Sequence, residues 1–182
     1  MIRNDLRNIA IIAHVDHGKT TLVDAMLKQS GVFRANEHVE ERVMDSNALE
    51  RERGITILAK NTAVMHNGTK INILDTPGHV DFSAEMERTL QVLDAAVLVI
   101  SGADGVQGHV ETLWKLLKYY QIPVFLFVNK MDQEGTDREK LLSELKKRLD
   151  GNCVDFNQEE TDYAAFAEEA AMSDEKLLEE YL

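Results

Sequence analysis

Short apolar runs alternate with longer amphipathic ones along most of this 182-residue chain. The apolar runs have the length of buried strands, and the amphipathic ones repeat apolar side chains at helical spacing. We expect strands at 8–13, 57–65, 69–75, 95–100 and 124–128, and helices at 19–29, 81–93, 107–119 and 137–149. This alternation predicts an α/β domain, an open and mostly parallel sheet with helices on both faces.

One connection departs from the alternation of strands and helices. Asn67-Gly68 separates two apolar-rich segments, and this dipeptide is the strongest short signal for a β-hairpin. The second and third strands are therefore expected to pair antiparallel. In the parallel part of such a sheet, ligands bind at the carboxyl ends of the strands. Three candidate motifs follow predicted strands at that edge, at 13–20, 75–79 and 129–132.

The net charge of −12 is concentrated near the C-terminal end. Residues 1–150 carry 22 acidic and 19 basic side chains, whereas residues 151–182 carry ten acidic side chains and one basic one, Lys176. This change separates a near-neutral domain at 1–150 from an acidic, helical segment at 151–182 that resembles an appended subdomain or the start of one. The charge of the first domain neither forbids nor requires an RNA-containing partner.

The composition favours a reducing, aqueous compartment. No apolar run approaches the roughly 20 residues of a membrane span, and residues 1–7 lack the apolar core of a signal peptide. The single Cys153 excludes an internal disulfide. We therefore expect a monomeric, cytoplasmic chain that binds neither membrane nor DNA.

The first candidate site is a loop between an expected strand and an expected helix, Ala13-His14-Val15-Asp16-His17-Gly18-Lys19-Thr20. It follows the P-loop pattern, with Ala13 in place of the first glycine. Loop N–H groups and the positive end of the helix can surround phosphate oxygens. Lys19 would reach the outer phosphates, and the Thr20 hydroxyl would ligate Mg²⁺. The alternative is a strand-to-helix turn that happens to contain Gly-Lys.

The connection from 31 to 56 has many charges and no sustained hydrophobic period. A connection of this length inside a compact domain is usually functional or mobile. We expect partial helix and an order that depends on ligand. Thr56, at its end, is either a second candidate Mg²⁺ ligand or an ordinary β-branched strand residue.

Three candidate residues belong to the motif that ends the third strand. Asp75 can hold a water of the Mg²⁺ shell, because Mg²⁺ keeps several waters and accepts few protein ligands. The Gly78 N–H could meet a terminal phosphate, and His79 could orient an attacking water. The alternatives are a strand-terminal aspartate and a solvated turn histidine.

The motif Asn129-Lys130-Met131-Asp132 follows the last predicted strand and can read a nucleotide base. The Asp132 carboxylate would accept two N–H bonds from a guanine edge, and adenine presents no such donor pair. The Lys130 stem can lie along the ring face. The motif therefore predicts a guanine nucleotide, GTP or GDP, and argues against an ATP-specific kinase or ATPase.

The expectations for Asp16 and for the histidines are less definite. A carboxylate beside phosphates is electrostatically unusual unless a cation is shared, which suggests a monovalent cation near Asp16. Metal ligation by His14 and His17 is not expected, since both lie in the phosphate loop. Surface positions are expected for His38, His66 and His109.

These motifs, in this order, resemble the first four motifs of the translational GTPases over about residues 6–150. The matching stretches are His14 to Thr21, Arg53-Gly54-Ile55-Thr56-Ile57, Asp75-Thr76-Pro77-Gly78-His79 and Asn129 to Asp132. Ala13 is usual in the elongation factor G branch. Residues 105–107 and 129–135 are most similar to elongation factor G and the ribosomal-protection tetracycline-resistance proteins, whereas residues 43–63 resemble BipA-type GTPases.

The resemblance implies a G domain with its switch segments at about 31–57 and 75–92. It implies GTP and Mg²⁺ binding through residues 14–21, Thr56, Asp75, Asn129, Lys130 and Asp132, with Thr21 part of the same motif. It also implies slow intrinsic hydrolysis, stimulated by the RNA of the large ribosomal subunit. Lys19, Gly78 and His79 would act in catalysis, with His79 positioning the water beside a gate formed by Val15 and Ile55.

The fifth motif of the family, a turn under the guanine that follows one more strand, is not found, nor are the later ribosome-binding domains. We therefore expect a truncated G domain that lacks its final edge strand, with residues 151–182 as the start of an insertion. The leading hypothesis is the GTPase domain of a ribosome-associated translation factor. The rivals are a GTP/GDP binding switch with negligible hydrolysis, and a P-loop kinase or ATPase.

Overall fold

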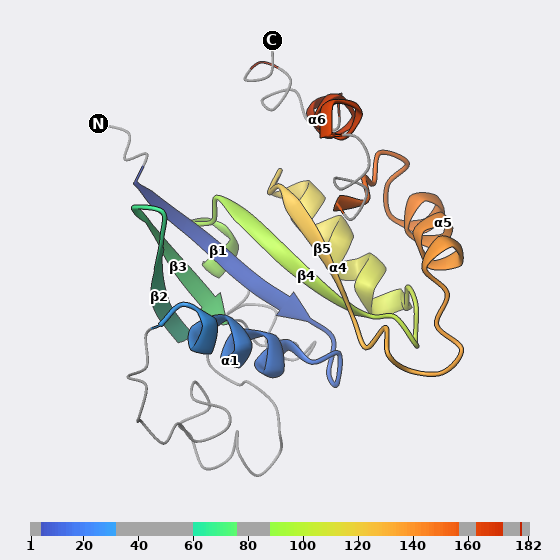
Figure 1. Ribbon diagram of the computed structural model, residues 1–182, viewed down its shortest axis with the longest axis horizontal. Helices are drawn as coiled ribbons and strands as arrows, with labels where there is room; N and C mark the ends of the chain where they lie inside the picture. The colour runs from blue at the N-terminus through green and yellow to red at the C-terminus, as the bar shows by residue number, and fades with distance from the viewer. Residues whose placement is uncertain (1–4, 32–59, 76–87, 157–162, 173–178, 180–182) are drawn as a thin grey trace.

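A computed structural model describes residues 5–31, 60–75, 88–156, 163–172 and 179 (Figure 1). Its strands form one sheet in the order β2-β3-β1-β4-β5. The strands are β1 (Leu6–Ala13), β2 (Lys60–His66), β3 (Thr69–Asp75), β4 (Ala95–Ser101) and β5 (Val124–Asn129). Only β2 and β3 pair antiparallel in this sheet, and the other neighbours run parallel. The predicted α/β sheet with one antiparallel hairpin is therefore confirmed.

The turn between β2 and β3 explains the hairpin. Asn67 and Gly68 both have positive φ, of 46° and 81°. Two consecutive residues of this kind give the two-residue turn whose twist matches that of the flanking strands. The turn joins His66 directly to its partner Thr69.

The parallel pairing places the carboxyl ends of four strands along one edge of the sheet. Ile11 of β1 is in register with Asp75 at the end of β3, and Ala13 is in register with Val99 of β4. Ser101, at the end of β4, pairs with Asn129 at the end of β5. The segments after β1, β3 and β5 therefore begin at the same edge, as the sequence predicts.

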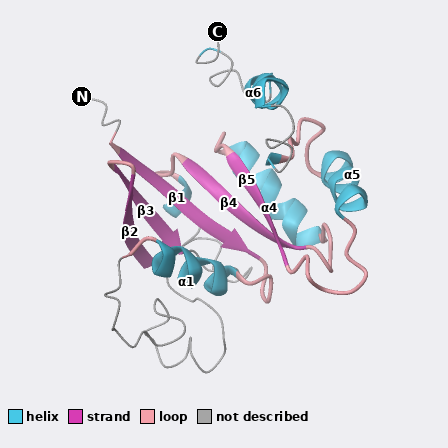
Figure 2. Ribbon diagram, viewed as in Figure 1, coloured by secondary structure: helices cyan, strands magenta, loops and turns pink. Residues whose placement is uncertain are grey.

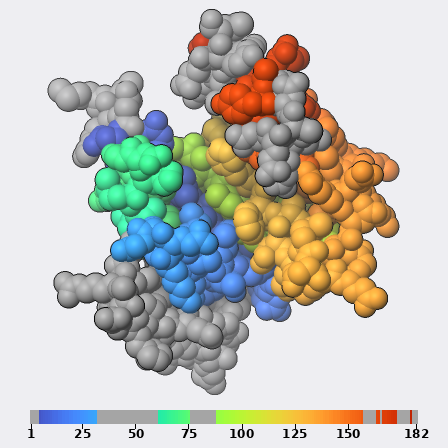
Figure 3. Space-filling model, in the orientation of Figure 1, coloured from blue at the N-terminus to red at the C-terminus, as the bar shows by residue number. Residues whose placement is uncertain are grey.

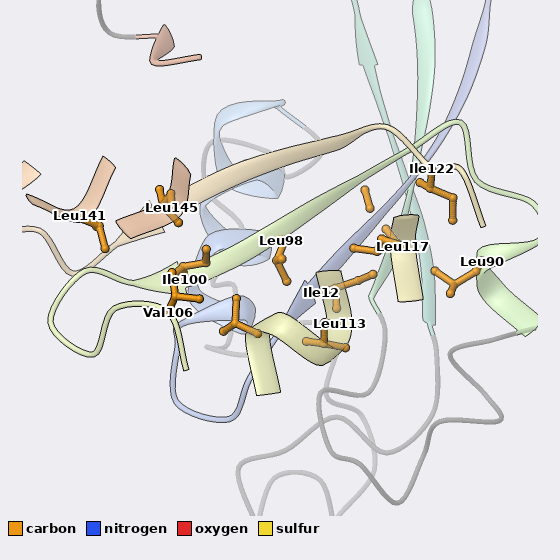
Figure 4. Close-up of a cluster of buried hydrophobic side chains, with 13 residues drawn as sticks. Ile12, Leu90, Leu98, Ile100, Val106, Leu113, Leu117, Ile122, Leu141 and Leu145 are labelled. Carbon is orange, nitrogen blue, oxygen red and sulfur yellow. The ribbon is translucent and has the colours of Figure 1, made fainter. Parts of the chain in front are cut away.

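Helices cover both faces of the sheet, with α1 in front of it and α4 behind it in Figure 2. The helices are α1 (Lys19–Gln29), α4 (Gly108–Tyr119), α5 (Arg138–Arg148) and α6 (Tyr163–Met172). Successive side chains of a strand point to opposite faces, and β1 follows this rule. Ile11 packs with α1, and Ile12 packs with α4 and α5 in the larger cluster shown in Figure 4.

The strand predicted at 124–128 is confirmed as β5, but the expectation that it is buried is wrong for one of its faces. Leu126 packs against the core on the α4 side, but Phe125 and Phe127 are 52% and 41% exposed. The core cluster under α1 draws its strand residues from β1, β2, β3 and β4, with none from β5. Phe125 instead lies beside Phe156, at 5.9 Å between ring centroids.

The helix boundaries agree closely with the sequence pattern where the structure describes them. Ser30 caps the C-terminal end of α1 and is followed by Gly31 with a φ of 70°. Asp137 caps α5 by accepting a hydrogen bond from the Lys140 N–H at 3.0 Å. Most of the helix predicted at 81–93 lies outside the described residues; its described part ends at Leu90, which is buried, three residues before the predicted end. Within the described ranges, every helix is too short or too polar to cross a membrane.

Candidate functional site

The loop between β1 and α1 has two residues in the left-handed region of the backbone. Asp16 has a φ of 64° and Gly18 a φ of 90°. Aspartate tolerates this conformation better than most residues, and glycine adopts it freely. Ala13 is the last residue of β1 and is not among the residues with positive φ. Alanine therefore fits the first position of the motif because that position is still strand.

The N-terminal end of α1 has features that suit an anion. Gly18 is the N-cap, and no side chain caps the helix. The first turn also contains no acidic residue. Unpaired N–H groups and the positive end of the helix dipole favour a phosphate at such a position. The helix thus begins with the local structure that the sequence predicted for a phosphate site.

Lys19 and Asp75 form a buried ion pair, with 2.8 Å between Lys19 Nζ and Asp75 Oδ1. Their side chains are 9% and 1% exposed. Lys19 opens α1, and Asp75 ends β3, next to β1 in the sheet. Such a pair is stabilised only by good geometry, because each ion loses its water. The lysine of the first motif and the carboxylate of the second therefore meet at one point.

The oxygen atoms at this point suit Mg²⁺. Thr20 supplies a hydroxyl on the first turn of α1, and Asp75 supplies a carboxylate at the neighbouring strand end. Mg²⁺ prefers oxygen ligands and takes few from the protein, because it retains several waters and binds substrate phosphates. The described residues contain no group of three or more His, Cys, Asp or Glu arranged to hold a metal. The phosphates of a bound nucleotide would complete the ligand set of a Mg²⁺ ion held by such oxygens.

The base-reading motif is tied to the phosphate loop by one hydrogen bond. The Asn129 side-chain amide donates to the main-chain oxygen of His17 at 2.9 Å. The same amide lies so close to Gly18 that a Cβ at residue 18 would overlap it. Figure 3 shows the blue N-terminal part of the chain touching the gold segment near residue 130. Glycine is therefore required at residue 18 both by its backbone conformation and by the packing of Asn129.

The rest of the base-reading motif faces solvent. Lys130 is half-buried with a φ of 59°, and Asp132 is exposed. The Thr136 hydroxyl lies 2.8 and 2.9 Å from the main-chain oxygens of Met131 and Gln133, which share its one proton, and this contact closes the turn behind Asp132. The Asp132 carboxylate is thus accessible, on a turn that is held by its own hydrogen bonds.

His17 is a structural member of the phosphate loop. Its side chain is 2% exposed, and its Nδ1 lies 3.3 Å from the main-chain oxygen of Val99 on β4. Burial lowers the pKa of the imidazole, and nearby His14 and Lys130 act in the same direction, against the Val99 carbonyl and Asp104. A neutral ring with its proton on Nδ1 would donate to Val99. His17 thus fastens the loop to β4.

The expectation that His109 lies on the surface is only partly right, because its side chain is half-buried. Its ring packs against that of His14, with 4.7 Å between centroids, and its Nε2 is buried. His109 is the second residue of α4, which begins near the carboxyl end of β4. A helix start at the ligand edge of the sheet was visible in the sequence and could have identified this residue. His66 is exposed as expected, and His38 lies outside the described residues.

The structure describes some of the remaining predicted site residues and leaves others outside the described ranges. Val15 is half-buried, Asp16 is exposed, and Thr21 lies on the exposed side of the first turn of α1. Thr56, Ile55, Gly78 and His79 lie outside the described residues, so their roles remain predictions. The described part of the site is the phosphate loop, Asp75 and the base-reading motif.

Comparison with known proteins indicates the same family as the sequence motifs do. The family profile of the elongation factor Tu GTP binding domain matches residues 4–180. The chain is 55% identical over 144 residues to the large ribosomal subunit assembly factor BipA of Bacillus subtilis, covering 79% of this chain and 24% of that protein. It is 51% identical over 137 residues to the putative elongation factor TypA-like SVR3, chloroplastic, of Arabidopsis thaliana, and the match covers 75% of this chain and 20% of that protein.

A solved structure of a protein from Thermus thermophilus superposes with a TM-score of 0.71 at 30% identity, over 79% of this chain and 22% of that one. The chain spans about a quarter of the length of the curated relatives it matches. The family match, the high identity and the shared fold all agree with the motifs. The chain therefore belongs to the translational GTPases, as a GTP-binding domain of the elongation factor Tu type in the branch that includes elongation factor G and BipA.

Proposed function

We propose that this chain binds GTP and hydrolyses it as the G domain of a ribosome-associated factor, and that the whole protein acts in assembly of the large ribosomal subunit. The observation that carries the proposal is the hydrogen bond from Asn129 to the His17 main chain, because it joins a base-reading motif to a phosphate loop. The names of the BipA relatives support the ribosomal partner. They favour assembly over translocation or tetracycline protection, the other roles that the sequence motifs suggested.

The phosphates would lie over the start of α1. Loop N–H groups would surround them, and Lys19 would turn from Asp75 toward the outer phosphates or bridge both. Bound Mg²⁺ would neutralise phosphate charge during transfer. Thr20 and Asp75 are the described residues proposed to hold that ion, with Thr56 as the ligand from the preceding segment.

The guanine would be read by the exposed turn after β5. The Asp132 carboxylate accepts the two N–H donors of the guanine edge, and the Lys130 stem lies along the ring. This geometry disfavours adenine, which lacks that donor pair. Competition by GDP but not by ADP against a fluorescent GDP analogue tests the base preference. Equal competition by ADP would contradict it and favour the rival kinase or ATPase.

Hydrolysis needs little covalent chemistry from the protein, because phosphoryl transfer depends on positioning and on stabilising charge. We propose that His79 orients the water, that the Gly78 N–H contacts the terminal phosphate, and that Lys19 stabilises the charge that develops. His79→Ala in the full-length protein should retain GTP binding while ribosome-stimulated turnover collapses. Normal turnover would show that His79 is a solvated turn histidine.

A second candidate function is a GTP/GDP binding switch without useful hydrolysis in the isolated chain. The open face of β5 favours it, since Phe125 and Phe127 leave that side of the domain incompletely packed. Phosphate release from GTP, measured with and without 50S subunits, separates the two functions. Turnover that rises with 50S subunits supports the GTPase, and nucleotide binding with no phosphate release under either condition supports the switch.

Asp16 is proposed to share a monovalent cation with the phosphates. It is exposed and held at positive φ, so its carboxylate is available beside the loop. Nucleotide affinity should then rise when potassium replaces a bulky organic cation at constant ionic strength. An affinity that does not respond to potassium would contradict the cation site. We also propose a cytoplasmic location, in keeping with a ribosomal partner.

A further inference from the structure

Three histidine rings, two from the phosphate loop and one from α4, form a row in which the His14 ring contacts the other two. The centroids of His14 and His17 are 5.4 Å apart with nearly perpendicular planes, and those of His14 and His109 are 4.7 Å apart. His14 and His17 belong to the loop after β1, whereas His109 belongs to α4. The proposed function uses the main chain of the loop but assigns no part to these rings.

The three side chains contact one another through their rings. Burial is the main cause that lowers the pKa of His17. In the part of the chain that the structure describes, the buried His14 Nδ1 has no hydrogen-bond partner, so ring packing is the contact that the structure shows for this side chain. Among the described residues, the three histidines are not arranged as a metal site.

The two ends of the row differ in rigidity. His109 stands on a helix whose next turns are fixed in the core by Val110, Leu113 and Leu117, all buried. The loop, by contrast, contains Asp16 and Gly18 in the left-handed region. A loop of this kind keeps its conformation only if neighbouring groups hold it. The row thus connects a rigid helix to a loop that needs support.

We propose that His109 is a positioning residue for the phosphate-binding loop, and that it acts by packing against His14. This inference rests on the proposed nucleotide binding for its functional consequence. His14 in turn packs against His17. The main-chain oxygen of His17 accepts the hydrogen bond from Asn129, and the His17 ring lies within hydrogen-bond distance of Val99 on β4. The helix α4 thereby sets the position of the loop relative to the base-reading motif. The contact is one of shape between flat rings, so another flat ring can replace His109.

The first test measures the affinity of the 182-residue chain for a fluorescent GDP analogue. His109→Ala should weaken binding roughly threefold to tenfold, the range expected for one aromatic pair. His109→Phe should restore binding, since it keeps a ring against His14. Thr112→Ala, on an exposed position of the same helix, is the matched control and should bind as the wild type does. Affinity unchanged in His109→Ala, or equally weak in His109→Phe, would overturn the proposal.

A double-mutant cycle tests whether His109 acts through His14. His14→Ala alone should weaken binding, and adding His109→Ala should weaken it no further, because the contact is already lost. If the fold losses of affinity in the two single variants multiply in the double variant, the two residues act independently, and this result would overturn the proposal.

A second measurement is independent of nucleotide. Amide hydrogen exchange of residues 14–20 in the ligand-free chain should be faster in His109→Ala than in the wild type and normal in His109→Phe. Unchanged exchange in His109→Ala would contradict the positioning role. If the wild type fails to bind GDP while exchange responds as expected, the proposed function fails and the positioning role stands. The melting temperature of each variant is measured as well, and an unchanged value would show that the effect is local and not a general loss of folding.

Discussion

The side-chain amide of Asn129 donates a hydrogen bond to the main-chain oxygen of His17, 112 positions away in the sequence. It joins the end of β5 to the loop after β1, across β4, which lies between these strands in the sheet. The loop that would hold phosphates and the turn that would read the base are therefore kept at a constant separation. The close approach of the same amide to Gly18 makes that separation sensitive to a single methyl group.

Gly18→Ala should weaken GDP binding by at least about tenfold, because alanine at positive φ costs about 1–2 kcal/mol and its Cβ would also displace Asn129. Titration of a fluorescent GDP analogue measures the loss. Gly31→Ala is the matched control, since Gly31 has a φ of 70° but no atom within 4 Å of its added Cβ. The control should lower the melting temperature and leave the affinity unchanged. Equal affinity of Gly18→Ala and wild type would show that Asn129 is not held as described.

Asp132→Asn should shift the preference from guanine to xanthine nucleotides. The change replaces an acceptor-only carboxylate with an amide that also donates, and xanthine offers an oxygen where guanine has its amino group. Competition by GDP and by XDP gives the two affinities. Glu134→Gln removes an acidic group from the same exposed turn and should leave the preference unaltered. Unchanged GDP affinity in Asp132→Asn would remove the role of Asp132 in base recognition.

Lys19→Met should destabilise the ligand-free chain by about 3 kcal/mol, because it leaves the Asp75 carboxylate buried without its cation. Urea unfolding measures the free energy of unfolding of each variant. Lys19→Met combined with Asp75→Asn should recover much of this loss, since the buried charge is then absent. Neither variant should bind GTP. A double variant as unstable as the single one would show that the ion pair does not determine the effect.

The buried His17 should make folding sensitive to mild acid. Its pKa is lowered in the folded chain, so below its ordinary value near 6.5 the unfolded chain takes up a proton that the folded chain does not. The unfolding free energy should therefore fall as the pH drops from about 6.5 toward the folded pKa, by at most about 1.4 kcal/mol per pH unit. Urea titrations across this window measure the slope.

His17→Gln keeps an N–H donor for the Val99 carbonyl but cannot titrate, so its slope should be shallower than that of the wild type. His66→Gln changes an exposed histidine of the hairpin and should preserve the wild-type slope. Identical slopes in the wild type and His17→Gln would assign the acid sensitivity to other groups.

Local sequence determined most of the fold and the motif positions. Asn67-Gly68 produced the hairpin because few other dipeptides adopt positive φ at two successive positions. The apolar runs produced the strands, since a parallel strand that is buried on both faces has no polar alternation. Leu113 and Leu117 are buried as their helical spacing predicts. These features depend on a residue and its near neighbours, which is why pattern alone identifies them.

Long-range packing decided what the patterns could not. Phe125 and Phe127 read as core residues, yet they lie on a face of β5 that the core under α1 does not reach. His109 was expected on the surface, yet it is half-buried and its ring packs against His14 of the phosphate loop. The Lys19–Asp75 pair joins α1 to the end of β3, and the Asn129–His17 bond joins the end of β5 to the loop after β1.

The sequence by itself determined that the candidate phosphate loop and the candidate guanine-reading motif lie at one edge of an α/β sheet, because each motif consists of contiguous residues. Only the tertiary structure decided how these parts support one another. The contacts of Asn129, Asp75 and His109 depend on sheet order and helix placement, which arise from the packing of the whole domain and leave no periodic signal in any single segment.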